Sequence, residues 1–385
     1  MNRARTAVAA AAIALAGGVA AVSGAFAGAP PTPPAKPLDT AVHDALTAAP
    51  VKGITARIAF TNKLIDASSL TGGGPLLAGA KGRVWLAADG RARLELQSDR
   101  GDAQVMSDGK RITLYDASSN TAYVATLPAE EDVKERADAP PSLARIRKGL
   151  ARLAESVDLT GPTGANVAGR EAYSVRFGPR HDGGLIGAGE LAWDAATGAP
   201  LRAGIYAAGA KEPVLELAAT DISYGPVDAA ALRVAVPANA KVVRTDLGGA
   251  RRDAAGKEVG SITGQAAVTK AVPFSLAAPE ALVGLPRKEV RLVELGDAKG
   301  ALVTYGAHLG GIAVLEQPAR GAPAKPAKKD EGAQLQLPKI SIDGVAGEEL
   351  ATALGTVVRF TRGGVRYTVI GSVPPAAAEA AARGL

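Results

Sequence analysis

The chain has 385 residues and a formal net charge of +6, and this length suits two domains better than one. Hydrophobic residues make up 47% of it, yet the aromatic residues are only 2 Trp, 7 Tyr and 5 Phe. The absence of Cys excludes disulfides, thiolate metal sites, Fe–S clusters, a Cys nucleophile and an N-terminal lipid anchor. The three His are far apart in sequence, so we expect neither a metal nor a cofactor.

The first 27 residues have the pattern of a secretory signal peptide. Arg3 and Arg5 precede an uncharged apolar run over residues 7–22, and small residues then allow a cut after Ala27. The alternative is a retained membrane anchor, although the run is short for a span of ~20 residues. We therefore expect a secreted, extracytoplasmic protein in a periplasm-like space or the cell wall.

The charge of the mature chain would be mild. Removal of residues 1–27 takes away two Arg and no acid, which lowers the net charge from +6 to +4. Basic residues are interleaved with acidic ones and aromatic residues do not cluster near them. This pattern does not predict a nucleic-acid partner. We also expect the protein to be a monomer.

Residues 28–37 contain five Pro and predict an extended tether with nothing to bury. The first domain is predicted over 38–244, and it opens with a short helix over 38–48 that Asp39 or Thr40 would cap.

From residue 53 the apolar period changes to two, which is typical of half-buried strands. The strands are predicted over 53–61, 83–87, 91–97, 103–107, 110–116 and 120–126. The dipeptides Asp89-Gly90 and Asp108-Gly109 lie between alternating segments and indicate tight hairpin turns. The pattern therefore predicts an antiparallel meander with one apolar and one polar face.

An amphipathic helix is predicted over 142–157, with Ser142 as its cap. Its apolar positions are Leu143, Ile146, Leu150, Leu153 and Val157. Further strands are predicted over 172–177, 189–194, 201–207 and 214–224, and the segment 234–237 would end the first domain. The polar segment 245–261 has no apolar period and predicts an interdomain linker.

A small C-terminal α+β domain is predicted over 262–385. The segment 271–274 is expected to be extended, the loop 320–332 disordered, and residues 347–350 a short helix. Strands are predicted over 289–295, 300–305, 311–317, 339–345, 356–361 and 365–370. Pro374-Pro375 would open a final helix that ends near Arg383.

Motifs that would carry catalysis are missing. The segment 187–192 fits a loose dinucleotide-binding pattern, but it lies between predicted antiparallel strands rather than before a helix. There is no G-x-S-x-G elbow and no P-loop. His181 and His308 are expected in loops. We predict no catalytic residues, and an enzyme is the least favoured of the three function classes considered.

Several short motifs resemble known envelope proteins. Those over 82–86, 91–95 and 107–116 are similar to the LolA family of lipoprotein carriers. Those over 167–173, 190–194, 197–202 and 236–240 resemble the related RseB/MucB type of sigma-factor regulator. The resemblance covers about 38–244. It implies an α+β fold with a strongly curved antiparallel sheet, a LolA-like half-barrel capped by helices around an apolar cavity. It also implies binding of acyl chains or peptides without chemistry.

The predicted helix 142–157 offers an apolar stripe that could cover the apolar face of the sheet. A ligand cavity would form where this cover fits loosely, and otherwise the same side chains would make a closed core. The candidate lining residues are Trp85, Leu94, Leu96, Leu114, Tyr123, Leu143, Ile146, Leu150, Leu153, Trp193 and Ile205.

Two functions follow as hypotheses. The first is a non-catalytic envelope protein that binds a lipid, a lipoprotein or another apolar ligand in the half-barrel. The alternative is an RseB-like regulator that binds a membrane-anchored partner such as an anti-sigma factor.

Overall fold

The computed structural model describes residues 31–65, 77, 79–99, 101–117, 119–127, 142–233, 236–246, 262–295, 298–307, 309–319 and 337–385. The predicted signal peptide, the predicted disordered loop 320–332 and His308 lie outside these residues. The chain divides into two compact units. The first comprises Met1–Arg180, Ala188–Gly249 and Gly332–Gln334, and the second comprises His181–Gly187, Ala250–Glu331 and Leu335–Leu385.

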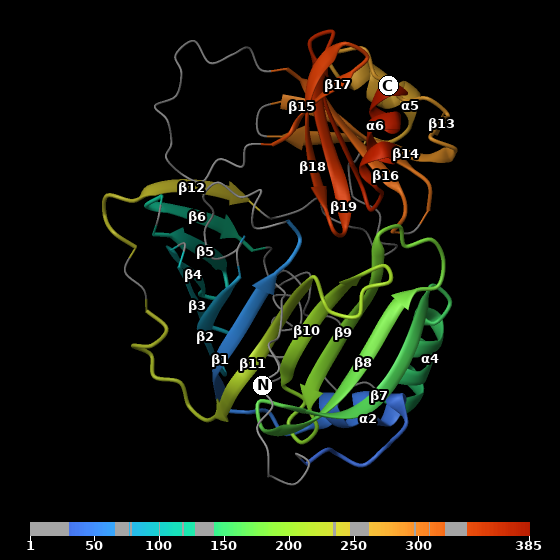
Figure 1. Cartoon of the computed structure of the whole chain (residues 1–385). Helices are drawn as coiled ribbons and strands as arrows, with labels where there is room; N and C mark the ends of the chain where they lie inside the picture. Colours follow the sequence, from blue (N-terminus) through green and yellow to red (C-terminus); the bar gives the residue numbers. More distant parts are fainter. Residues whose placement is uncertain are drawn as a thin grey trace. The chain divides into compact units, whose positions relative to one another are not determined.

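The first unit is built on a twelve-stranded sheet in the order β12-β6-β5-β4-β3-β2-β1-β11-β10-β9-β8-β7 (Figure 1). The strands are β1 (Gly53–Asn62), β2 (Ala80–Ala87), β3 (Ala92–Ser98), β4 (Gly101–Ser107), β5 (Arg111–Asp116), β6 (Thr121–Thr126), β7 (Val157–Val167), β8 (Arg170–Pro179), β9 (Ile186–Asp194), β10 (Pro200–Ala207), β11 (Leu215–Tyr224) and β12 (Lys241–Asp246). Strands β1–β6 form the predicted antiparallel meander, whereas β12 pairs with β6 in parallel. The helices α2 (Leu38–Thr47) and α4 (Leu143–Leu153) accompany the sheet.

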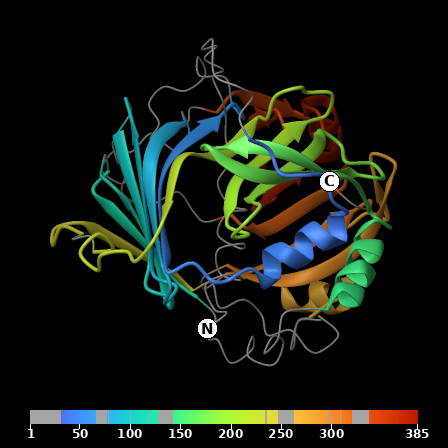
Figure 2. The ribbon, with the colours of Figure 1, turned by 90° about the horizontal axis from the view of Figure 1, so that it is seen from below.

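The sheet is strongly curved, as Figure 2 shows. Alternate residues of β1, among them Ile54, Ile58 and Phe60, are buried and share one hydrophobic cluster with Ala103 of β4 and Val167 of β7, two strands far apart in the sheet. Side chains from distant strands can meet in this way only on the inside of the curve, so this side is the inner face. The predicted α+β class with a curved, half-barrel sheet is confirmed.

Two elements of the first unit differ from the prediction. The helix predicted over 142–157 ends at Leu153, and the strand β7 begins at Val157. Gly161 and Pro162 interrupt the period of β7, so the strand leaves little trace in the sequence. Ser142 does cap the helix, because its hydroxyl accepts a hydrogen bond from the Arg145 N–H at 3.4 Å.

The strand β12 is the second difference. It extends to Asp246 and so includes two residues of the predicted linker. Its parallel pairing partner β6 lies more than a hundred residues earlier in the chain, and no local turn signal announces such a pairing.

The second unit has an eight-stranded sheet in the order β13-β14-β15-β16-β20-β19-β18-β17. Its elements are α5 (Gln265–Ala271), β13 (Ala281–Leu282), β14 (Leu285–Leu295), β15 (Ala298–Tyr305), β16 (Ile312–Pro318), β17 (Lys339–Ile342), β18 (Val345–Thr352), β19 (Gly355–Arg362), β20 (Val365–Gly371) and α6 (Pro375–Arg383). Val268 of α5 and Ala378 of α6 are fully buried in the same core as Val303 and Val369 of the sheet.

The predicted helix at 347–350 is wrong, because these residues lie in β18 between β17 and β19. Hydrogen bonding to strands on both sides outweighs the weak local helix preference of Glu348 and Glu349. The helix α5 was not predicted, and it covers Ala271, which the sequence places in an extended segment. Asp343 and Gly344, both with positive φ, form the two-residue turn between β17 and β18.

A buried carboxyl group lies in the core of the second unit. The Glu316 side chain on β16 is fully buried, and its Oε2 accepts a hydrogen bond from the Ala277 N–H at 2.9 Å. Its Oε1 has no hydrogen-bond partner among the described residues. Burial raises the pKa of Glu316 to about 7, above its ordinary value of 4.5.

This raised pKa predicts that the second unit loses stability as the pH rises. The folded state binds the Glu316 proton more tightly than the unfolded state does, so stability is highest below about pH 4.5 and declines until the pH passes about 7. The free energy of unfolding of the second unit should fall by about 3 kcal/mol in all. Hydrogen exchange of the Val303 and Val369 amides between pH 5 and pH 8 measures it. Glu316→Gln should abolish the pH dependence and the exposed control Glu348→Gln should keep it; an unchanged slope in Glu316→Gln would contradict the prediction.

Candidate functional site

A row of apolar side chains crosses the inner face of the first unit from strand to strand. Directly paired positions place Ala56 of β1, Val84 of β2, Leu94 of β3, Val105 of β4, Leu114 of β5, Tyr123 of β6 and Val243 of β12 next to one another. Paired side chains on one face of a sheet lie about 5 Å apart at their Cβ atoms. We call these seven residues the apolar row.

The exposure of the apolar row rises toward the edge of the sheet. Ala56 is 4% exposed, Val84 to Leu114 are half-buried, and Tyr123 and Val243 are 46% and 39% exposed. Exposed large apolar groups in a continuous row are uncommon on a soluble domain and mark surfaces that bind something. The described residues therefore leave the β5–β6–β12 part of the inner face open.

A second set of paired positions lies beside the apolar row and is closed. Ile58, Leu96 and Ala103 are at most 5% exposed, and Gly82 lies between the first two. A Cβ added at Gly82 would come within 2.0 Å of the Glu95 carbonyl oxygen. Glycine is therefore required where β2 and β3 approach so closely.

The structure divides the sequence-predicted lining residues among several places. Leu94, Leu114 and Tyr123 belong to the apolar row, and Leu96 lies beside it in the closed part. Ile205 is half-buried on β10 opposite Leu215.

Trp85 does not line the inner face. It pairs with Thr55 and Arg93, which alternate with the apolar row and point to the outer face. There its ring lies 5.2 Å from the Arg93 guanidinium. Leu86 takes the inner position that the sequence analysis gave to Trp85, and a strict count of the alternation from Val84 would have found it.

Trp193 belongs to a separate cluster beneath α2. Its ring centroid lies 6.3 Å from that of Tyr173, its directly paired neighbour on β8. Ala41 of α2 is buried against both rings, with Leu38 and Ala45 beside it. The helix that covers this part of the sheet is therefore α2.

The α4 helix packs against α2, which corrects the expectation that its leucines face the sheet. Ile146 is buried, Leu143 and Leu150 are half-buried, and Leu153 is 46% exposed. The Arg147 Nε donates a hydrogen bond to the Asp39 Oδ2 of α2 at 2.5 Å, and this bond lowers the pKa of the Asp39 carboxyl. The two helices form one layer with α2 innermost.

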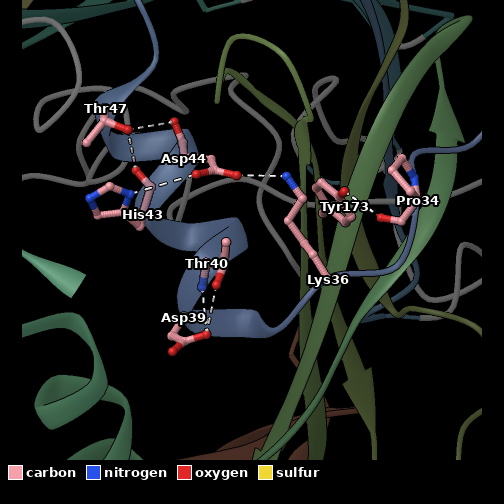
Figure 3. A network of polar contacts seen from close by, with 8 residues as sticks. All are labelled: Pro34, Lys36, Asp39, Thr40, His43, Asp44, Thr47 and Tyr173. Atoms are coloured by element: carbon pink, nitrogen blue, oxygen red, sulfur yellow. Dashed lines mark hydrogen bonds and ion pairs between the residues drawn. The ribbon is translucent and has the colours of Figure 1, made fainter. Parts of the chain in front are cut away.

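The segment 31–37, predicted as part of a free tether, fastens α2 to the sheet (Figure 3). Pro33 is buried, and the Tyr173 hydroxyl donates a hydrogen bond to the Pro34 carbonyl at 2.7 Å. The Lys36 ammonium lies 2.7 Å from the Asp44 carboxylate and 5.2 Å from the Tyr173 ring centroid. The hydrogen bond from Lys36 lowers the pKa of Asp44 and raises that of Lys36.

A polar network that the sequence did not predict lies on the strands β8–β11. Glu190 accepts hydrogen bonds from Ser174 at 2.7 Å, from Tyr206 at 2.6 Å and from Arg202. Burial raises the pKa of the Tyr206 hydroxyl to about 12, so it stays protonated and remains a donor. Every oxygen of Glu190 thus has a partner, and the network stabilises the strands rather than offering a free acid or base.

Within the described ranges, no group of His, Asp and Glu side chains could hold a metal ion. No helix in the described part of the chain is both long and apolar enough to span a membrane.

Solved structures similar to the chain include MucB from Pseudomonas aeruginosa in complex with MucA, at 18% identity and a TM-score of 0.43, covering 89% of this chain and 96% of that one. A LolA superfamily protein from Nitrosomonas europaea matches at 9% identity and a TM-score of 0.22, covering 51% of this chain and 96% of that one. This likeness concerns the fold alone. No protein-family model and no curated protein matches the chain.

The fastening of α2 can be tested at Tyr173. Tyr173→Phe removes the hydrogen bond to Pro34 but keeps the ring, and we expect a loss of about 0.5–1.5 kcal/mol in unfolding free energy. Amides of α2 should exchange faster with deuterium. Tyr115→Phe is the matched control, because its hydroxyl also donates one side-chain hydrogen bond, to Asn120, on a strand far along the sheet from β8. Equal effects of both variants on α2 exchange would refute this role.

Proposed function

We propose that the chain is a non-catalytic, extracytoplasmic binding protein that holds an apolar ligand, a lipid or a lipoprotein acyl chain, on the open part of its inner face. The exposure gradient of the apolar row carries this proposal. The signal-peptide pattern of residues 1–27 supports the location.

The alternative of a closed core applies to one part of the face. At β1 and β3 the inner side chains Ile58 and Leu96 are buried among protein atoms. Toward the edge, Leu114, Tyr123 and Val243 retain accessible apolar surface, and each Å² covered by a ligand contributes about 25 cal/mol. An acyl chain laid along these residues would extend the hydrophobic cluster that β1 and β3 begin.

Tyr123 is the position that tests the apolar site. Tyr123→Ser should weaken binding of a fluorescent fatty-acid probe about tenfold or more, because the ring supplies the largest accessible apolar area of the row. Stability should change little at a half-exposed position. Leu191→Ser, at a residue 37% exposed on β9, is the matched control. Native mass spectrometry of protein from its own host should show an apolar adduct that Tyr123→Ser lacks. A clean apo mass with no probe uptake would exclude the proposal.

A second candidate function is an RseB-like regulator that binds a membrane-anchored protein partner. The feature that favours it is β12, an edge strand whose only pairing among the described residues is with β6. Val242 and Val243 on this strand are 42% and 39% exposed. An exposed edge with apolar side chains can accept an extended segment of a partner by strand addition.

Crosslinking in cells separates the two candidates. A photo-crosslinking residue at Val242 should capture one membrane-anchored protein if β12 accepts a partner. The same residue at Ile370, which is 46% exposed on β20, is the control and should capture none. Lipid adducts alone at Val242 would eliminate the regulator and leave the apolar-ligand proposal standing.

A further inference from the structure

The outer face of β1–β3 carries a hollow of about 600 Å³ on the side of the sheet opposite the apolar row. It is lined by Arg57, Ile58, Ala59, Lys81, Gly82, Arg83, Glu95, Gln97 and Thr220. The alternation along each strand places Arg57, Lys81 and Arg83 on this face, because they lie between the inner residues. A volume of this size accommodates a small-molecule ligand.

The charges around the hollow are unbalanced. Arg57 and Arg83 are directly paired across β1 and β2, and both are exposed. Like charges opposite one another destabilise a sheet. None of the three cations forms an ion pair within the described part of the chain.

The nearby acids form no ion pair with these cations in the described part of the chain. Glu95 lies directly opposite Arg83 on β3, but its ion pair is with Arg93, which also donates a hydrogen bond to the Ala231 carbonyl at 2.9 Å. Asp221 lies opposite Arg57 on β11, where the register shifts by one residue, and makes no ion pair with it. The three cations are therefore available to an anion.

We propose that this hollow binds a phosphate-bearing small molecule or headgroup. The Arg57 and Arg83 guanidinium groups present planar forks of donors that match phosphate oxygens, and Lys81 adds a third positive charge. Gln97 and Thr220 supply neutral hydrogen-bonding groups at the wall. The anion would relieve the repulsion between the paired arginines, so binding and sheet stability are linked. This site is independent of the apolar row.

Isothermal titration with sn-glycerol 3-phosphate and with inorganic phosphate tests the site, with glycerol as the neutral control ligand. Arg57→Gln and Arg83→Gln should each weaken binding about tenfold or more, since each loses charge-assisted hydrogen bonds. Asp221→Asn should tighten binding. Arg145→Gln, at an exposed residue of α4, changes the net charge equally and should bind as the unsubstituted chain does.

A stability measurement distinguishes a binding site from an ordinary surface. Without phosphate, Arg57→Gln should raise the melting temperature by about 1–3 °C, because it removes the like-charge pair.

Cosedimentation with phosphatidylglycerol and phosphatidylcholine vesicles separates the two sources of phosphate. Arg57-dependent binding to vesicles supports a lipid headgroup, and Arg57-dependent binding of glycerol phosphate supports a soluble compound. The proposal is overturned if neither binds, or if Arg145→Gln weakens binding as much as Arg57→Gln. Acyl-probe binding should be unchanged in Arg57→Gln, so a negative result for phosphate binding does not contradict the proposed apolar site.

Discussion

The central constraint on the first unit is that its sheet curves strongly without closing. A closed barrel would bury the inner face by its own strands, whereas this sheet has edge strands at both ends, β12 and β7. The inner side chains of an open sheet need another cover, and the cover differs along the sheet. Opposing strands bury Ile58 and Leu96. At β5, β6 and β12 the described residues supply no complete cover, and the apolar row becomes exposed there. The open part of the inner face is thus a direct result of how far the sheet curls.

The position of α2 on the sheet depends on a small side chain and on polar contacts as well as on apolar packing. Ala41 allows α2 to approach Tyr173 and Trp193 closely, because a larger side chain would not fit between the helix and the rings. The segment 31–37 then holds the helix through the Tyr173 hydroxyl and Lys36. A proline-rich segment loses little conformational entropy when it docks, since its φ angles are already fixed. The same composition that suggests a free tether therefore also suits a strap along a sheet.

The sequence predicted the meander well because its signals are local. Asp89-Gly90 and Asp108-Gly109 set the turns, and strict alternation sets which residues share a face. Elements defined by distant partners were missed, as with β12 and its parallel pairing to β6. The lining residues followed the same division. Leu94, Leu114 and Tyr123 follow the period-two alternation of the inner face, whereas Trp85 occupies the alternate position, which points outward. The basic hollow was not predicted, because Arg57 and Arg83 become neighbours only through strand pairing.

The strands β1–β3 combine two different surfaces by alternation alone. Ala56, Val84 and Leu94 face inward, and the residues between them bring Arg57, Arg83 and Glu95 to the outer face. A ligand cannot pass through a hydrogen-bonded sheet, so the proposed apolar ligand and the proposed phosphate would bind on opposite faces of these strands. The backbone of Gly82 is close to both surfaces, since it lies between Ile58 and Leu96 on the inner face and, like Ile58, lines the outer hollow. Because no side chain fills its position, the close approach of β2 and β3 there determines the shape of both surfaces at once.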